Sequence, residues 1–84
     1  MKIQAEISIY PLRTKSLSEP IDEFCRILHE YDIETKTTSM STSISGETKD
    51  IFKACKAAFE QLSMKYQIVM NMKISNACPS EKTE

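Results

Sequence analysis

Three side chains that can form hydrogen bonds stand at alternate positions near the N-terminus: Glu6, Ser8 and Tyr10. In an extended strand they share one face, with successive side chains about 7 Å apart. A carboxylate, a hydroxyl and a phenol so arranged indicate one of three things: a binding site, a contact with another subunit, or a solvated face whose hydroxyls reflect β-propensity alone.

The thiols and the single histidine do not predict a metal or redox site. His29 follows Cys25 by one helical turn, but two ligands are too few for zinc. We therefore expect Cys25 and Cys55 in the core, and His29 near a helix C-terminus, where positive charge is favourable. Cys78, in a polar tail, is either an exposed thiol or incidental. Three cysteines without a C-x-x-C pair favour a reduced, cytoplasmic location.

Catalysis finds little support in the residue pattern. We find no nucleophile-and-base arrangement of serine, cysteine and histidine, and the lone glycine excludes glycine-rich phosphate loops and dinucleotide motifs. An acylphosphatase-type enzyme would want an arginine in a glycine-containing loop, and Arg13 follows the first strand with no glycine beside it. We predict a protein that is not an enzyme and needs no cofactor.

The length and the net charge of the chain limit the classes of partner that it can bind. Eighty-four residues suffice for one domain, and eleven basic against twelve acidic residues provide no electrostatic footprint for nucleic acid. No run approaches the roughly 18 apolar residues of a membrane span. The sequence predicts neither a nucleic-acid nor a membrane partner.

The first half of the chain predicts a strand, a helix and a second strand. Residues 2–10 alternate strictly and should form a strand that Pro11 ends. Ser18 should cap a helix that runs to about residue 31. Its apolar stripe consists of Ile21, Phe24, Cys25 and Leu28. Residues 33–38 are rich in β-branched side chains and predict the next strand.

The second half repeats this order. Residues 39–41 predict a turn and residues 42–45 a returning strand closed by Gly46. Thr48 should cap a helix of about fifteen residues, in which Phe52 and Phe59 widen the buried face. Residues 66–74 alternate again and predict the last strand. We expect a single domain over residues 1–76 and a flexible tail over 77–84.

The order β-α-β-β-α-β predicts an α+β ferredoxin-like fold, a four-stranded antiparallel sheet with two helices on one face. The uncovered face should display the polar side chains of the strands, which are Glu6, Ser8, Tyr10, Thr38, Ser43 and Asn71.

Two segments carry a resemblance to a known family. Residues 5–12 read A-E-I-S-I-Y-P-L, and residues 39–47 read S-M-S-T-S-I-S-G-E. Together with the element order, they resemble the thiamine-binding protein family, whose members begin with A-E-I-S-hydrophobic-x-P-L and carry P-M-G-T-x-x-E-G-E in the central hairpin. Here Arg13-Thr14 replaces the family's G-T, Ser39 replaces a proline and Ser41 replaces a glycine.

The resemblance implies a non-catalytic protein that binds thiamine or its hydroxymethylpyrimidine portion as a carrier, buffer or sensor. It also implies homodimers or homotetramers formed through the sheets. The aminopyrimidine and the cationic thiazolium call for hydrogen-bonding side chains and an apolar or aromatic plate. The implied ligand residues are Glu6, Ser8, Tyr10, Thr38, Met40, Thr42 and Ser43. The alternative is a regulatory or assembly module of the same fold that binds another small molecule at a subunit interface.

Overall fold

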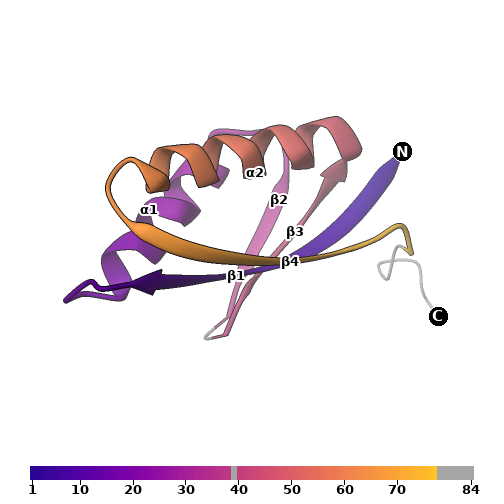
Figure 1. Cartoon of the computed structure of the whole chain (residues 1–84). Coiled ribbons are helices and arrows are strands. Elements are labelled where there is room, and N and C mark those ends of the chain that lie inside the picture. The colour runs from indigo at the N-terminus through magenta and orange to yellow at the C-terminus, as the bar shows by residue number, and fades with distance from the viewer. Residues whose placement is uncertain (39, 78–84) are drawn as a thin grey trace.

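The elements follow the predicted ferredoxin-like order. The computed structural model describes residues 1–38 and 40–77. The elements are β1 (Lys2–Leu12), α1 (Ser18–Leu28), β2 (Glu34–Thr37), β3 (Thr42–Glu47), α2 (Thr48–Ser63) and β4 (Gln67–Ser75). The antiparallel sheet has the order β2-β3-β1-β4, and both helices cover one of its faces (Figure 1). Of the expected tail, all but Ala77 lies outside the described residues, as does Cys78.

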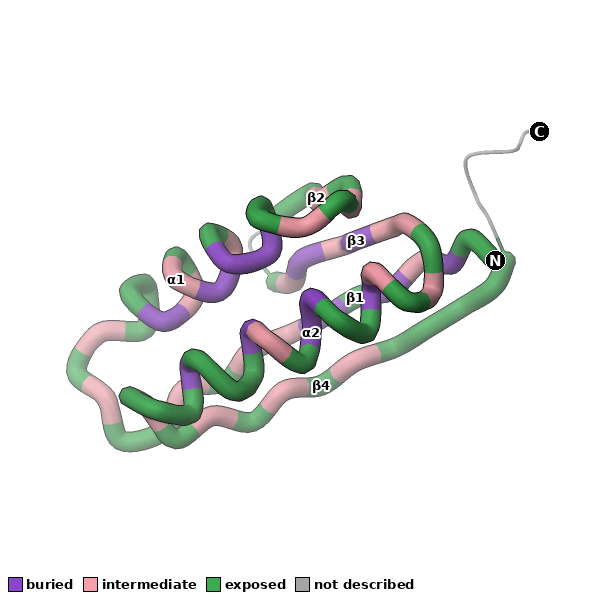
Figure 2. The backbone as a smooth tube through the Cα atoms, turned by 90° about the horizontal axis from the view of Figure 1, so that it is seen from above, coloured by how far each residue is buried: buried purple, intermediate pink, exposed green. Residues whose placement is uncertain are grey.

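The core lies between the helices and the covered face of the sheet. Ile3, Ala5 and Ile7 of β1 are buried there together with Ile44 of β3, because alternate residues of a strand share one face. The helices contribute Phe24, Ile27, Leu28, Ile51, Ala54, Cys55, Ala58 and Leu62. Figure 2 shows the burial pattern along the backbone of the described residues.

Pro11 does not end the first strand, contrary to the prediction. β1 continues to Leu12, and Pro11 pairs with Ile68 of β4. On its other side β1 is paired with β3 only as far as Ile7. That side is therefore open at Pro11, and an open edge is where a strand tolerates a residue without an N–H group.

The first helix differs from the prediction at both ends. Ser18 is its first helical residue rather than its cap, and the backbone N–H of Glu19 is satisfied by the Ser16 hydroxyl at 3.4 Å. The helix ends at Leu28, three residues early. Its fully buried face includes Pro20 and Ile27, whereas Ile21 and Cys25 of the predicted stripe are only half-buried. Cys25 therefore flanks the core rather than lying inside it.

The second half of the chain has three corrections. Gly46 lies within β3. A Cβ added there would stand 3.1 Å from Cγ2 of Ile33, so the absence of a side chain leaves room for the loop between α1 and β2. Thr48 donates its hydroxyl to the Met1 carbonyl at 3.0 Å instead of capping α2. Phe52 and Phe59 are 48% and 42% exposed, so the buried face of α2 is narrower than predicted.

Candidate functional site

The tip of the β2–β3 hairpin is shaped by one threonine. The backbone N–H groups of Met40 and Ser41 donate to Oγ1 of Thr38 at 3.3 and 3.2 Å. The same hydroxyl donates to the Ser41 carbonyl at 3.0 Å, which also accepts the N–H of Thr38 at 2.8 Å. The Thr38 hydroxyl is thus occupied by the turn it closes.

A small cleft lies under this tip, on the helix side of the sheet. It encloses about 50 Å³. Its floor is apolar and its rim carries hydroxyls and the Met40 chain; the lining residues are Ile7, Ile9, Ile21, Phe24, Thr37, Thr38, Met40, Ser41 and Thr42. An apolar floor with a few convergent polar groups is the usual composition of a small-molecule site.

Two hydroxyls in the cleft have only weak partners. Oγ1 of Thr37 lies 3.6 Å from Sγ of Cys25, and Oγ1 of Thr42 lies 3.9 Å from the same sulfur. Thr42 is 4% exposed. A thiol is a weak donor and a weak acceptor, so both threonine hydroxyls retain the capacity to bind a stronger partner.

Two residues of β1 fasten the tip from the opposite face. The Ser41 hydroxyl donates to Oε2 of Glu6 at 3.0 Å, and the Ser8 hydroxyl donates to the Met40 carbonyl at 3.4 Å. The strand pairing of β1 with β3 stops at Ile7, so these two bonds hold the tip beyond the last paired residues. The Glu6 carboxylate itself lies on the uncovered face, in a hollow with Ser43 and Lys73, and it reaches the tip through the Ser41 hydroxyl.

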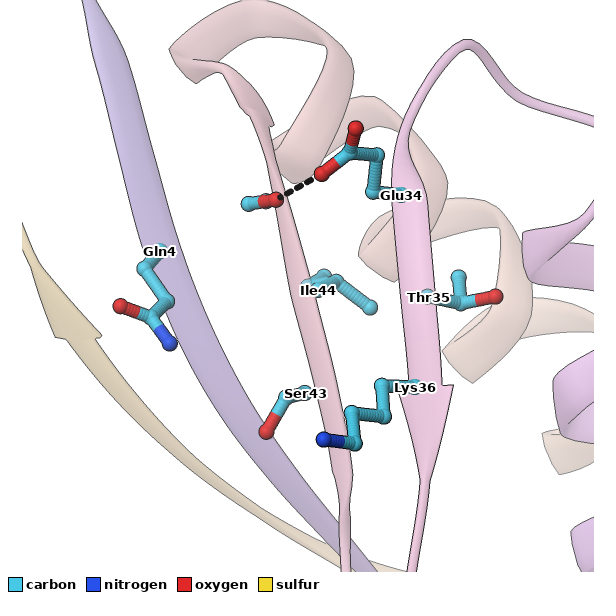
Figure 3. A pocket seen from close by; sticks show the side chains of 7 residues that line it. Gln4, Glu34, Thr35, Lys36, Ser43 and Ile44 are labelled. Atoms are coloured by element: carbon cyan, nitrogen blue, oxygen red, sulfur yellow. Dashed lines mark hydrogen bonds between the residues drawn. The ribbon is translucent and has the colours of Figure 1, made fainter. Parts of the chain in front are cut away.

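The uncovered face of the sheet carries a broader hollow. It spans about 520 Å³ over β1, β2 and β3, and Figure 3 shows Gln4, Lys36 and Ser43 around it. The Ser45 hydroxyl donates to the Glu34 carboxylate there at 3.2 Å. Ile44 is the one aliphatic residue in the lining, and it is buried in the core. The other residues that line the hollow are all polar or charged.

The structure divides the seven predicted ligand residues between these two regions. Thr38, Met40 and Thr42 line the cleft, and Glu6 and Ser8 reach its tip by hydrogen bonds. Tyr10 pairs with Val69 of β4 and lines neither region, and Ser43 lies in the polar hollow. Thr38 was expected on the uncovered face, but β2 ends at Thr37 and the chain turns Thr38 into the cleft.

The prediction missed the cleft residues that carry no polar motif: Ile7, Ile9, Ile21 and Phe24, together with Thr37 and Ser41. Thr42 was already in the predicted set, and it faces the cleft because it has the same parity along β3 as the buried Ile44. Ile21 of α1 and Ile9 of β1 are half-buried and line the cleft together, a tertiary arrangement that the sequence pattern does not encode.

Two groups elsewhere have shifted pKa values. The hydrogen bond and charge of the Met1 ammonium, 2.9 Å from Oε1, hold the pKa of Glu47 below its usual range. Burial raises the pKa of the Cys55 thiol from 9.0 to about 11. Cys55 is therefore an inert core thiol.

Neither a metal centre nor a membrane span is found in the part of the chain that the structure describes. Residues 1–38 and 40–77 contain no group of three or more histidine, cysteine, aspartate or glutamate side chains that could hold a metal ion. Within the same residues, no helix combines the length and the apolar composition that crossing a membrane requires.

One residue that departs from the resembled family has an unusual backbone. Arg13 has φ = 54°, in the left-handed region that glycine adopts without strain. Its guanidinium donates from Nη1 to Oε1 of Gln67 at 2.7 Å. The chain thus keeps a glycine-type conformation at a position where the family carries glycine.

Comparison with known sequences shows the same family. Residues 5–83 match the thiamine-binding protein family. The UPF0045 protein MJ1052 of Methanocaldococcus jannaschii is 31% identical over an alignment that covers 98% of this chain and 84% of the relative.

Solved structures support the fold. The crystal structure of the Methanocaldococcus jannaschii protein superposes with a TM-score of 0.84 at 30% identity, covering 98% of this chain and 87% of that one. A Thermotoga maritima protein named for thiamine biosynthesis or salvage gives 0.82 at 19% identity, covering 92% and 85%. A designed ferredoxin-fold protein gives 0.63 at 11% identity, covering 99% and 92%. The last two are similar in fold alone.

Proposed function

Because this chain belongs to the thiamine-binding protein family, we propose that it binds thiamine or the related hydroxymethylpyrimidine, without catalysing a reaction on it. The cleft under the hairpin tip is the binding site in this proposal. A cytoplasmic carrier, buffer or sensor is the role that fits a binding protein whose Cys25 and Cys55 are free thiols.

The observation that carries the proposal is the pairing of an apolar floor with two weakly bonded hydroxyls. An aminopyrimidine is a flat ring with a donor amine and acceptor nitrogens. Ile9, Ile21 and Phe24 offer the apolar surface against which such a ring packs. The hydroxyls of Thr37 and Thr42 can each donate or accept, so they suit both kinds of ring atom.

Charge is the second element of the proposal. The thiazolium of thiamine is a cation, and Glu6 places a carboxylate at the tip. With the ring in the cleft, the cationic end would lie at the rim near Glu6. Ser41 already donates to this carboxylate, and a carboxylate accepts several hydrogen bonds, so the charge stays available.

The closed cleft is smaller than the roughly 300 Å³ of a drug-sized site. Binding therefore requires the tip to move away from α1. The hydrogen bonds that hold the tip to β1 come from the hydroxyls of half-buried Ser41 and Ser8 and are themselves exposed to solvent, and bonds of this kind each contribute only about 1 kcal/mol. A tip fastened so weakly can open at modest cost.

The proposal includes self-association as a homodimer or homotetramer. Tyr10, Leu12 and Val69 are large, exposed and close together on the uncovered sheet face, where Tyr10 pairs with Val69 across the strands. Contiguous exposed apolar side chains favour contact with another subunit. In this proposal Tyr10 and Ser43 belong to the subunit contact on the uncovered sheet face. The residues that bind the ligand are then those of the tip and the cleft.

Isothermal titration with thiamine and with hydroxymethylpyrimidine tests the function. We expect saturable binding of at least one of them. Thr42→Val keeps the shape of the side chain and removes its hydroxyl, so it should weaken binding about tenfold, the equivalent of about 1.4 kcal/mol.

Thr35→Val is the matched control for this substitution. It makes the same chemical change on the same side of the sheet but outside the cleft. There the Thr35 hydroxyl is hydrogen-bonded to Nε2 of His29 at 2.7 Å. It should leave affinity unchanged. Absence of heat for both compounds at millimolar protein would reject the function, and equal loss in both variants would reject the site.

A further inference from the structure

A hollow at one end of the molecule gathers positively charged side chains. It spans about 590 Å³ between the loop that joins β1 to α1 and the turn that joins α2 to β4, which lie at the same end of the fold (Figure 1). Among the described residues that line it, Arg13, Lys15 and Lys65 are cations and Glu19 is the one carboxylate. The whole chain has a formal net charge of -1, so this hollow is opposite in sign to the protein. A concave surface that concentrates one sign of charge attracts ligands of the other sign.

Two of the three cations lack a carboxylate partner among the described residues. None of the ion pairs formed within residues 1–38 and 40–77 includes Arg13 or Lys15. Arg13 instead donates from Nη1 to the neutral amide oxygen of Gln67 at 2.7 Å. A guanidinium carries five N–H donors, so this bond leaves most of them for a ligand.

The third cation, Lys65, is only partly neutralised. Its Nζ lies 3.4 Å from Oε1 of Glu23, and the same carboxylate lies 3.9 Å from Nη2 of Arg26. One negative charge is therefore shared by two cations. The Lys65 side chain is exposed, and an ion pair in contact with solvent is weak, so the ammonium can turn to a stronger anion.

The lining of the hollow suits a phosphate group attached to an organic molecule. The planar guanidinium of arginine binds two phosphate oxygens through parallel hydrogen bonds, and lysine ammonium groups add positive charge. Exposed Leu12 and half-buried Tyr66 stand in the same lining. Their aliphatic and aromatic surfaces can pack against the organic part of the ligand.

We propose that this hollow binds a phosphate monoester, with the phosphate group on Arg13, Lys15 and Lys65. The hollow shares no lining residue with the cleft under the hairpin tip, so binding of the ester and binding of thiamine are independent. Arg13 stands where the family carries glycine. The site is therefore expected in this chain and not in relatives that keep the glycine.

Chemical-shift titration with phenyl phosphate measures the binding. The titration is run at about pH 8, where a phosphate monoester is a dianion, and at constant ionic strength, so that general screening does not change. We expect saturable shifts of the backbone amides of Arg13, Thr14, Lys15 and Gln67. Inorganic phosphate should bind about threefold more weakly, because it lacks the ring that packs on Tyr66. Equal or tighter binding of inorganic phosphate would overturn the assignment to an ester.

Substitutions in the hollow test which groups hold the phosphate. Arg13→Gly removes the guanidinium without straining the backbone, because φ at this residue is 54°. It should weaken binding of phenyl phosphate about tenfold. Arg13→Lys should restore only part of the affinity, since an ammonium lacks the planar fork. Glu19→Gln should strengthen binding, because it removes the carboxylate that repels the ligand.

A matched pair of lysine variants separates the site from the charge of the protein as a whole. Lys15→Gln should weaken binding about threefold. Lys56→Gln makes the same change in charge at an exposed residue of α2 outside the hollow, and it should leave binding unchanged. All the substituted side chains are exposed, so the fold should survive, which circular dichroism checks. Equal losses in the two lysine variants, or shifts that do not saturate at about 50 mM phenyl phosphate, would overturn the proposal.

Discussion

The cleft under the hairpin tip and the hollow on the uncovered sheet face are formed by opposite sides of the same strands. On the helix side, Ile7 and Ile9 alternate with Glu6 and Ser8, so β1 supplies the floor of the cleft. On the other side, the same alternation exposes a polar surface whose hydroxyl at Ser45 is already bonded to Glu34. The difference lies in what covers each side, because α1 closes one and leaves the other open.

This contrast indicates which region offers a ligand the more favourable binding free energy. A small molecule in the cleft removes apolar surface from water at roughly 25 cal/mol per Å² and meets hydroxyls with weak partners. On the uncovered face it would displace water from groups that are solvated or bonded to each other. The cleft is the binding region in this account, and the uncovered face is a contact surface.

The largest expected contrast is in stability. Phe24 is 1% exposed and belongs to both the cleft and the core, so Phe24→Ala should cost about 3–5 kcal/mol. Tyr10→Ala on the uncovered face should cost about 1 kcal/mol or less. Urea denaturation measures both, with Phe24→Leu as the milder variant where the alanine does not fold. Equal losses at the two positions would contradict the assignment of core and surface.

The Glu6 carboxylate should strengthen the binding of thiamine more than that of hydroxymethylpyrimidine. Glu6→Gln removes the carboxylate at the tip but keeps an acceptor for the Ser41 hydroxyl. Thiamine should bind about tenfold more weakly, since a charge-assisted interaction of about 1.4 kcal/mol is lost. Hydroxymethylpyrimidine, which lacks the cation, should change less than threefold. If calorimetry shows the same loss for both compounds, Glu6 does not face the thiazolium.

The buried Cys55 should make the stability of the fold depend on pH in the alkaline range. Burial raises the pKa of Cys55 to about 11, so the folded state favours the neutral thiol. The unfolded thiol ionises above its ordinary pKa of 9.0, and stability contributed by Cys55 is therefore complete below pH 9 and lost as the pH rises toward 11. The expected slope is at most about 1.4 kcal/mol per pH unit. Urea denaturation at several pH values measures this slope, and Cys55→Ala should flatten the curve.

The smallest effects concern the two departures from the family's glycines. Arg13→Gly relieves a positive φ at the expense of the bond to Gln67, so stability should rise by about 1 kcal/mol or less with unchanged affinity. Ser41→Gly releases Glu6 and widens the rim, so affinity should change while stability moves by about 1 kcal/mol or less. Thermal melts measure the stability of both variants and calorimetry measures their affinity for thiamine. A changed affinity in Arg13→Gly with an unchanged affinity in Ser41→Gly would refute these assignments.

The strand and helix order could be predicted because each element carries its own period. Ile3, Ala5 and Ile7 alternate in the sequence and are buried in the structure. Pro11 was misjudged because its tolerance depends on β3 stopping at Ile7, a property of the sheet rather than of the residue. Phe52 and Phe59 were placed inside because hydrophobicity alone does not say which side of a helix lacks a neighbour.

The candidate site was predictable only in part for the same reason. Glu6 and Thr42 were predicted as ligand residues from the resemblance to the family and from their residue types, but their placement on opposite sides of β1 and β3 needed the register. Thr38 looked like a ligand residue, yet its hydroxyl is spent on the turn. Ile21 and Phe24 come from a helix whose approach to the hairpin is a tertiary contact, so no local motif marks them.

Amide and methyl chemical-shift mapping during titration with thiamine tests the cleft most directly. We predict that the largest shifts fall on Thr37, Ser41 and Thr42 together with the methyl groups of Ile9 and Ile21. Shifts confined to Gln4, Lys36, Ser43 and Ser45 on the uncovered face would contradict the account.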